Sequence, residues 1–450
     1  MDTILIIQML AAILIATAIY IFIGFIPGTD ETSVLLPVTL VIVLAQVHPM
    51  VVLAFFISAI VTLNFTNAMP TALAGLPGGV LSSPMIENAI HLKNEGMAAM
   101  TIKKMAAGGL ISIAISVPLS LLLANLLAPY ATSITPYARY LFIGGAIFLS
   151  LTSKARTLSL LSILPLAILF QSLRYLYWGI GLIPTNVNIT TSFFLAITIG
   201  PLVHSLFSLL NKKAYKQMEV SDYKTIKLNR HDEKIKTLNP FKILTKKELQ
   251  SASLSALITN FLFVLSPVGL IILIGELAAK RSKDVTESAQ ISIVSKAAMA
   301  QSTYLSQIII PLLALGIPLS PVAIGPGSAL FNAPPVLTLE NNLHHILSSS
   351  QFIIVVIVAA VIASAITYTF ISRYANSFTN FILKRIPHEA VLGLFVAFIL
   401  LLAYMDAGLI NIFGVLLIAL ISGTLNKLGV NYGVQFMSLY AAPFLVQYLL

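Results

Sequence analysis

The sequence predicts an all-α polytopic membrane protein with about twelve transmembrane helices in two repeats, including broken or re-entrant helical segments. Of its 450 residues, 58% are hydrophobic and only 9% are charged, whereas a soluble domain carries roughly 25% charged residues. Apolar stretches near the ~20 residues that span a bilayer recur from end to end. Each half also contains one apolar stretch that proline and glycine interrupt, and these residues break helices.

The charge distribution divides the chain at a basic connector. Residues 211–250 hold eleven Lys or Arg and five Asp or Glu, in a chain of net charge +10. Because cytoplasmic loops are enriched in Lys and Arg, we expect this connector to lie in the cytoplasm, next to anionic membrane lipids. The predicted domains are an N-terminal transmembrane repeat (1–210), the connector (211–250) and a C-terminal transmembrane repeat (251–450). We expect no nucleic-acid partner.

The candidate spans are rich in Leu, Ile and Ala, which favours helices over strands. In the first half they lie near residues 3–26, 34–47, 50–66, 106–128, 138–152, 157–178 and 190–210. In the second half they lie near 251–275, 289–314, 351–371, 389–404, 408–425 and 432–449. No basic start or small-residue cleavage site precedes Gly24, so the first stretch is expected to be a retained span. The stretch 251–275 is either one long tilted helix or a hairpin bent near Pro267.

A turn that leads into a helix is predicted directly after the first span. It carries Pro27, Gly28, Thr29, Asp30 and Glu31. Threonine and acidic side chains at such a position cap free backbone N–H groups and suit the positive end of the helix dipole. Ionisable groups within a membrane segment are also candidates for a function, here a site for a coupling cation or a proton. Both interpretations stay open.

The interrupted stretch of the first half is the first candidate binding segment. Its residues are Gly75, Pro77, Gly78 and Gly79, and Asn67 lies shortly before them. A broken helix exposes N–H groups where one half-helix begins and carbonyls where the other ends. The N–H groups can hold an anion, and the carbonyls can hold a cation. Close helix packing is the alternative explanation for small residues.

The interrupted stretch of the second half has the same features. Its candidate residues are Ser302, Gly316, Pro318, Ser320, Gly325, Gly327 and Asn332. We expect the substrate site between segments 73–79 and 316–327, near the middle of the membrane. Backbone N–H groups around Gly78, Gly79 and Ser320 would hold an anionic group. Side chains of Asn67, Ser302 and Asn332 would orient it, and carbonyls near Gly75 and Gly316 would contact the coupling cation.

Sequence signatures of enzymes are missing. The chain has no cysteine, so it has no thiolate nucleophile or thiolate metal site. His388-Glu389 is not followed by the second histidine of a zinc-protease helix, and the chain contains no phosphate-binding P-loop. We therefore expect no enzymatic activity, no catalytic residue, no bound metal and no cofactor.

Three of these motifs resemble the large membrane subunit of the tripartite tricarboxylate transporters. They are residues 24–39, residues 73–109 and residues 311–331, and 412–429 is similar to the C-terminal span of that family. This sequence departs from the family pattern at Asp30-Glu31, at Gly78-Gly79 and in its long basic connector, so it looks like a divergent member that could act alone.

The resemblance implies a permease of a prokaryotic cell membrane. Its substrates would be small organic anions such as di- or tricarboxylates, taken up by symport with Na⁺ or H⁺. It also implies two partners, a small membrane subunit and an extracytoplasmic solute-binding protein. Two alternatives stay open. The chain could translocate a polyprenyl-phosphate lipid carrier through the same breaks, or it could be a non-transporting membrane scaffold.

Overall fold

The computed structural model describes residues 2–26, 29, 31–74, 78–134, 137–153, 155–183, 190–209, 237–265, 267–385, 388–430 and 432–447. These ranges are almost entirely helical, and their only bridges are two isolated pairs, Ala333 with Leu337 and Thr338 with Asn341. The predicted all-α fold is confirmed. Residues 211–236 of the connector 211–250 lie outside the described residues, and the division into two sequence domains stays a prediction.

The first half forms long helices joined by short turns. They are α1 (Thr3–Gly24), α2 (Glu31–Leu44), α3 (Pro49–Ala74), η1 (Ser83–Met85), α4 (Ile86–Asn94), α5 (Ala98–Leu127), η2 (Ala128–Tyr130), α6 (Ala131–Ile134), α7 (Ala138–Thr152), α8 (Arg156–Gly179) and α9 (Thr190–Leu209). Helix α5 begins at Ala98, eight residues before the expected span at 106. The basic pair Lys103-Lys104 therefore lies inside this helix and does not precede it.

The second half repeats this pattern of long helices separated by short ones. They are α11 (Pro240–Ile243), α12 (Lys246–Phe261), α13 (Pro267–Ala279), α14 (Val285–Ala314), α15 (Pro321–Ile324), η5 (Ser328–Leu330), α16 (Leu343–Ile346), α17 (Ser349–Arg385), α18 (His388–Lys427) and α19 (Tyr432–Gln447). The stretch 251–275 therefore contains a hairpin of α12 and α13. Helix α18 contains both expected spans, 389–404 and 408–425, and its backbone leaves helical geometry at Ala407 and Gly408 between them.

Seven helices in the described part of the chain are long and apolar enough to cross a membrane. Three shorter apolar segments accompany them, at Val34–Leu44, Phe142–Leu151 and Pro267–Ala279. Two of the seven, α3 and α14, are almost completely surrounded by protein, with 94% and 100% of their most apolar window buried. These two helices form the centre of the molecule, and both lead directly into an interrupted stretch.

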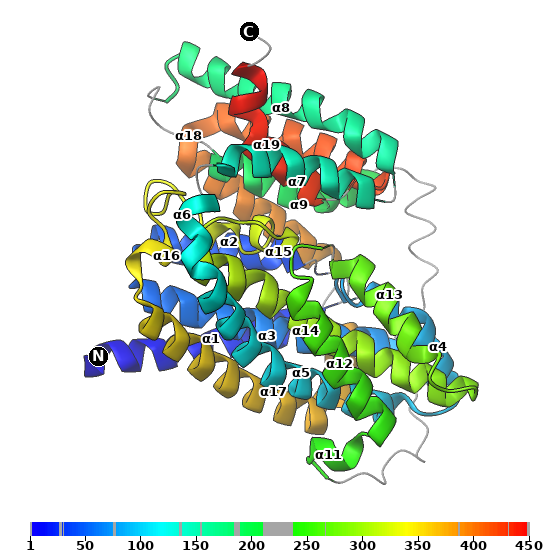
Figure 1. Ribbon diagram of the computed structural model, residues 1–450. Coiled ribbons are helices and arrows are strands. Elements are labelled where there is room, and N and C mark those ends of the chain that lie inside the picture. The colour runs from blue at the N-terminus through cyan, green and yellow to red at the C-terminus, as the bar shows by residue number, and fades with distance from the viewer. Residues whose placement is uncertain are drawn as a thin grey trace.

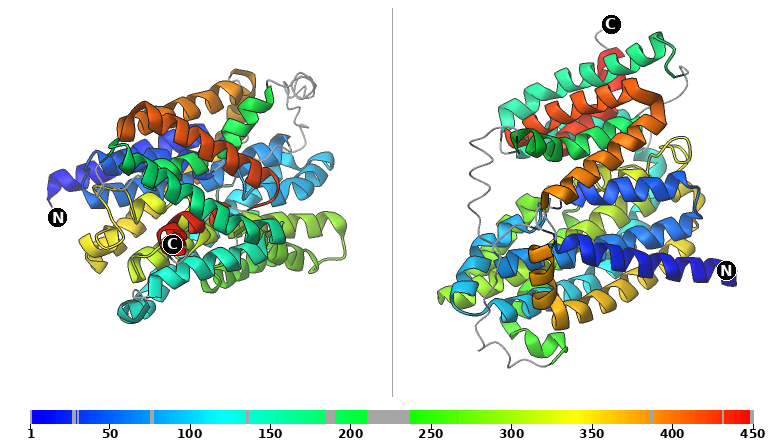
Figure 2. Two further views of the ribbon diagram at one scale, coloured as in Figure 1. Left: turned by 90° about the horizontal axis from the view of Figure 1, so that it is seen from above. Right: turned by 180° about the vertical axis from the view of Figure 1, so that it is seen from behind.

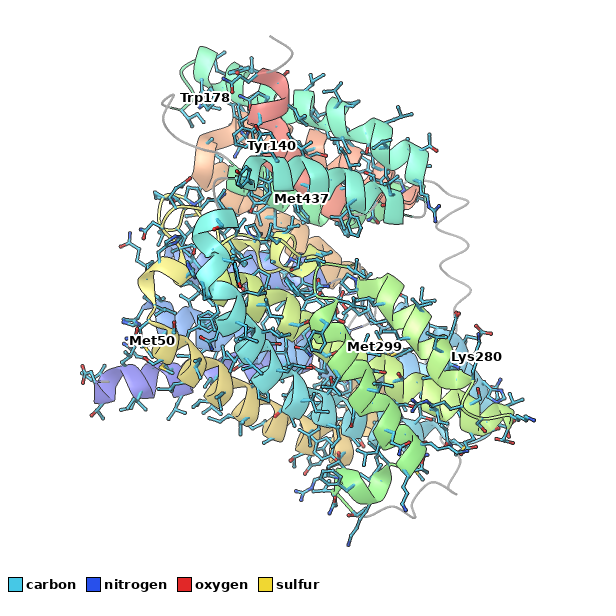
Figure 3. The ribbon with its side chains drawn as sticks, viewed as in Figure 1. Met50, Tyr140, Trp178, Lys280, Met299 and Met437 are labelled. Atoms are coloured by element: carbon cyan, nitrogen blue, oxygen red, sulfur yellow. The ribbon has the colours of Figure 1, made fainter. Side chains whose placement is uncertain are left out.

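The helices form two groups, which we call the lower body and the upper body (Figure 1). The lower body contains α1–α5 and α11–α17, and the upper body contains α7, α8, α9, α18 and α19. Each body combines helices from both halves of the sequence. Viewed from behind, the first part of α18 leads from the lower body to the upper body (Figure 2). Figure 3 places Met50 and Met299 in the lower body and Tyr140, Trp178 and Met437 in the upper body.

The lower body has the pairing expected of two interlocked repeats. Helix α3 packs against α1, α2 and α17, and α14 packs against the corresponding α12, α13 and α5. The two central helices also run in opposite directions. Met50, at the start of α3, and Lys280, just before α14, lie at opposite ends of the lower body (Figure 3). The loop that follows α14 meets the start of α3, around a cavity lined by Pro49, Val52, Leu337 and Leu343. The two central helices are thus antiparallel and have corresponding neighbours, an arrangement that an inverted repeat would produce.

Candidate functional site

The first break, residues 75–82, follows the end of α3. Gly75 and Pro77 lie outside the described residues, whereas Gly78 and Gly79 are buried. The hydroxyl of Ser82 supplies hydrogen-bond partners for the backbone groups of Gly78 and Gly79. It accepts hydrogen bonds from the N–H groups of Gly78 and Gly79, each at 3.0 Å, and donates one to the Gly79 carbonyl at 2.9 Å. The two N–H groups predicted to hold an anion therefore already have a partner.

The carboxylate of Glu31 completes the first break. Its Oε2 accepts from the Val80 N–H at 3.0 Å, and its Oε1 accepts from the Leu81 N–H at 3.4 Å. The Asn67 side-chain amide of α3 donates to Oε1 at 3.4 Å. Glu31 stands in the first turn of α2 and is only 2% exposed. The Glu31 side chain therefore caps a segment almost fifty residues further along the chain. Glu31 is also the first residue of α2.

Glycine is required at the first break because α3 and Glu31 lie directly on its backbone. A Cβ atom at Gly78 would lie 2.0 Å from the Asn67 carbonyl oxygen, and one at Gly79 would lie 2.3 Å from Glu31 Oε1. Non-bonded atoms do not approach a Cβ atom that closely, so a larger residue at either position would force the backbone apart. Close packing, the alternative offered for these small residues, is thus present at Gly78 and Gly79.

The second break, residues 315–327, follows the end of α14 and is also capped by side chains. Gly316 adopts φ +66°, a conformation that glycine reaches without steric cost, and its carbonyl accepts from Asn342 Nδ2 at 2.8 Å. Ser320 Oγ accepts from the Ala323 N–H at 3.1 Å and begins α15 as its N-cap.

Gln307 on α14 connects the second break to its neighbours. Its Oε1 accepts from the Val322 N–H at 3.2 Å, and its Nε2 donates to the Leu265 carbonyl at 2.8 Å. The Gln307 carbonyl accepts from the Ser320 hydroxyl. One side chain thus ties the second break to the turn between α12 and α13.

The two breaks share a sequence pattern that the residue-by-residue analysis missed. Proline, four residues, glycine, one residue and proline occur as Pro70 to Pro77 and again as Pro311 to Pro318. In this alignment Leu81 corresponds to Val322, and each of these N–H groups donates to a buried side chain, Glu31 or Gln307. The spacing of the prolines is therefore a signal that could have aligned the two breaks, although it does not identify the capping residues Glu31 and Gln307.

Within the described ranges, buried polar atoms without a partner occur on several helices. The two helices that lead into the breaks carry four of them: Ser58 Oγ and Asn67 Oδ1 on α3, and Gln301 Oε1 and Thr303 Oγ1 on α14. The Gln301 amide also joins the two helices, donating to the Val61 carbonyl at 3.2 Å. Unsatisfied buried acceptors are costly, so they commonly indicate a site for water, an ion or a ligand.

The sequence of the chain identifies the family to which these breaks belong. A family model described as the tripartite tricarboxylate transporter TctA family matches residues 10–434. The chain belongs to this family. It is therefore a multi-pass membrane protein and a component of a tripartite transport system, and the resemblance found in the motifs is confirmed. No curated protein and no solved structure matches the chain.

The other predicted site residues of this TctA family member are placed as follows. Thr29 Oγ1 donates to the Ile26 carbonyl at 2.9 Å and so caps the end of α1, rather than accepting from N–H groups of α2. Ser302 donates to the Met299 carbonyl of its own helix at 3.3 Å. Pro318, Gly325 and Gly327 are buried in the second break, and Asn332 is half-buried beyond it. Pro27, Gly28 and Asp30 lie outside the described residues.

Lys296 on α14 contacts the short helices that follow the first break. Its ammonium donates to the Pro84 carbonyl at 2.9 Å and to Asn88 Oδ1 at 2.7 Å. It therefore ties η1 and α4 to α14 and is not paired with Glu31. The described residues contain no group of three His, Cys, Asp or Glu side chains that could bind a metal ion.

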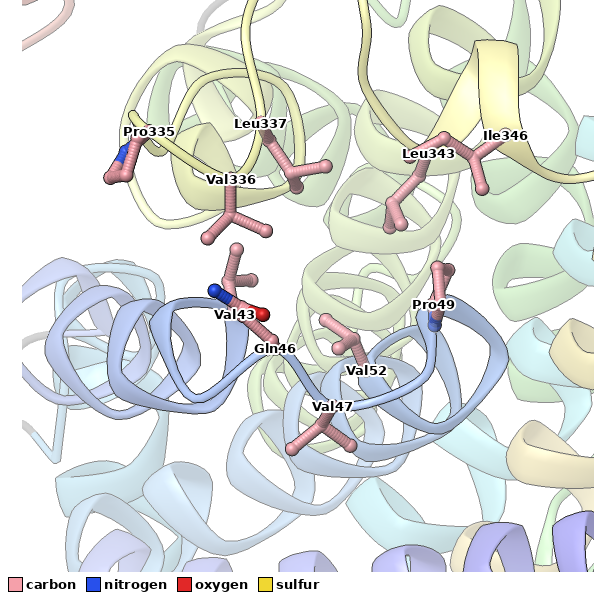
Figure 4. Close-up of a pocket in the computed structure, with 10 residues that line it drawn as sticks. All are labelled: Val43, Gln46, Val47, Pro49, Val52, Pro335, Val336, Leu337, Leu343 and Ile346. Atoms are coloured by element: carbon pink, nitrogen blue, oxygen red, sulfur yellow. The ribbon is translucent and has the colours of Figure 1, made fainter.

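Two cavities flank the loop that follows the second break. The larger, of about 380 Å³, lies between the α2–α3 turn and residues 335–346, and Val43, Gln46, Val336 and Ile346 contribute to its walls (Figure 4). The smaller, of about 210 Å³, lies where α2 meets α9 and α18 of the upper body. Pro335 lines both cavities, so this loop separates them.

Proposed function

We propose that this TctA family member is a secondary active transporter for small organic anions such as di- and tricarboxylates. A proton or sodium gradient would drive uptake by symport across the cell membrane of a prokaryote. A small membrane subunit and an extracytoplasmic solute-binding protein would be its partners. The proposal includes no enzymatic step.

One observation carries this proposal. Two broken segments follow antiparallel helices, and buried polar side chains hold both segments. Four buried oxygen atoms on those two helices have no partner within the described residues. Inside a bilayer, irregular backbone is tolerated only where protein buries it or where it lines a cavity. Family membership then supports a carboxylate as the ligand.

The proposed substrate site lies between the breaks. An anionic group would displace the Ser82 hydroxyl from the N–H groups of Gly78 and Gly79. Asn67, Ser302 and Asn332 would orient the substrate. Carbonyl oxygens near Gly75 and Gly316 would contact a coupling cation, for which the Asn342 amide now substitutes at Gly316.

Reconstituted proteoliposomes test the proposal. We expect radiolabelled citrate, malate or succinate to accumulate inside vesicles when an inward proton or sodium gradient is imposed, and not in protein-free liposomes. Binding should also stabilise the purified protein, by about 2.7 kcal/mol at a ligand concentration of 100 times Kd. The proposal fails if no di- or tricarboxylate accumulates under either gradient and none raises the unfolding temperature.

A further inference from the structure

Glu31 occupies the kind of site that a substrate carboxylate needs. Its two oxygen atoms accept from two successive backbone N–H groups, Val80 at 3.0 Å and Leu81 at 3.4 Å. Paired N–H donors at a helix break are a standard recognition element for carboxylates. A resident carboxylate and a bound one cannot use the same two donors at once, so the two groups compete.

The neighbouring amide of Asn67 suits both protonation states of Glu31. In the structure its Nδ2 donates to Glu31 Oε1 at 3.4 Å, while its Oδ1 is buried and has no partner in the described part of the chain. A carboxylate only accepts hydrogen bonds, whereas a carboxylic acid also donates one. Rotation of the amide would present Oδ1 to a protonated Glu31 and would give that oxygen its missing donor.

No positively charged side chain among the described residues pairs with Glu31. Helix α3 contains no ionisable side chain, and neither does the described part of the first break. The titratable side chain of α1 is Tyr20. It contacts α2, because its hydroxyl donates to the Val34 carbonyl at 2.9 Å. In the upper body, His204 on α9 contacts Lys427 at 3.2 Å, and Tyr404 and Asp406 lie on α18. Asp30 lies outside the described residues.

We propose that Glu31 carries the coupling proton, and that its carboxylate and the substrate carboxylate bind the Val80 and Leu81 N–H groups in turn. The inference rests on the proposed function and names its coupling ion. A proton from solution binds the Glu31 carboxylate, and the neutral acid donates to Asn67 Oδ1. The two N–H groups then bind the substrate carboxylate. One proton thus offsets one negative charge of the substrate, and no covalent bond to carbon changes.

A sodium ion fits this position less well than a proton. The donors around Glu31 present the positive ends of N–H dipoles, which repel a metal cation and attract an anion. A neutral carboxylic acid accepts hydrogen bonds more weakly than a carboxylate, so protonation weakens the hold of Glu31 on the break. Protonation and substrate binding therefore favour each other, as symport requires.

Glu31→Gln removes the proton site while keeping the size and an accepting oxygen of the side chain. In proteoliposomes we expect this variant to retain citrate–citrate exchange and to lose the accumulation that a pH gradient drives, which is about tenfold per proton for each pH unit. Glu287→Gln is the matched control, because Glu287 is an exposed residue at the start of α14. We expect that variant to behave like the wild type in both assays.

The outcomes separate this inference from the proposed function. Citrate accumulation by Glu31→Gln in response to a pH gradient would overturn the inference alone, and so would wild-type accumulation that depends only on sodium. Failure of the wild type to take up any carboxylate would overturn both. If Glu31→Gln does not fold, proton uptake by the wild type decides. The proposal expects roughly one proton bound per citrate in weakly buffered solution, and binding without proton uptake would overturn it.

Discussion

At the scale of residues, buried side chains replace the helical hydrogen bonds that proline and glycine remove. Glu31 serves the first break and Gln307 serves the second, and each accepts from an N–H group that no carbonyl of its own helix reaches. Ser82 and Ser320 cap further N–H groups of the described breaks. Because side chains hold the breaks, we expect single substitutions at these positions to change a break without changing the surrounding helices.

Gly78→Ala should destabilise the protein, because its new methyl group would lie 2.0 Å from the Asn67 carbonyl oxygen, which is backbone and cannot easily move. Overpacking of this kind costs about 1–3 kcal/mol. Thermal unfolding of the purified variant would measure the loss. Gly144→Ala in α7 is the matched control, because nothing lies within 4 Å of its Cβ position and alanine favours the helix. Equal unfolding temperatures for the two variants would contradict the close packing at the first break.

At the scale of elements, the lower body is held together by polar contacts between helices as well as by apolar packing. Lys104 on α5 forms a buried ion pair with Glu248 on α12 at 2.6 Å and donates to Gln290 on α14 at 2.7 Å. Along the same helices, Asn260 accepts from Ser120 at 2.6 Å. The Lys104 contacts therefore join three helices, and the Ser120–Asn260 hydrogen bond joins α5 and α12 a second time.

Lys104→Met should lower the stability of the lower body, because it leaves the Glu248 carboxylate buried without its counter-charge. Removing one partner of a buried ion pair typically costs 3–5 kcal/mol, roughly. Chemical unfolding in detergent would measure the change, and the double variant Lys104→Met with Glu248→Gln should recover part of it. Lys247→Met provides the comparison, since it breaks an exposed pair with Glu287 that water already screens. A wild-type unfolding midpoint for Lys104→Met would show that the buried pair contributes nothing.

At the scale of the whole molecule, α3 and α14 are long and apolar enough to cross a membrane, so we expect the two ends of the lower body to lie on opposite sides of it. Lys280 and Arg281 are exposed just before α14, and exposed Lys242 lies five residues before Lys247, which pairs with Glu287 in the first turn of α14. Exposed Glu340 and Ser350 lie at the other end, near the start of α3. The positive-inside rule then predicts that the end carrying Lys280 faces the cytoplasm.

Cysteine labelling tests this orientation directly, because the natural chain contains no cysteine. We expect Lys242→Cys to react with a membrane-impermeant maleimide in inside-out vesicles and to be protected in right-side-out vesicles. Glu340→Cys should show the reverse pattern. Labelling of both positions from the same side would refute the placement of these two ends on opposite sides of the membrane.

Much of the fold follows from local sequence. The low fraction of charged residues predicts a membrane protein, and the long apolar stretches predict helices. Both predictions depend only on how side chains and backbone groups partition between water and lipid. Pro77 and Pro318, together with the glycines near them in sequence, predict the two breaks. Proline alone does not decide this, because Pro70 and Pro311 stand inside α3 and α14. The Gly408 interruption of α18 also coincides with the gap between two expected spans.

The partners of these segments could not be predicted in the same way. The sequence identified Glu31 as a candidate for a cap or an ion site, but only the tertiary structure brought its carboxylate to Val80, 49 residues away. The opposite directions of α3 and α14, and the burial of Asn67, Gln301 and Thr303, were likewise decided by packing. Hydropathy and backbone chemistry act within a few residues of the chain, whereas the contacts that build a site depend on which helix faces happen to meet.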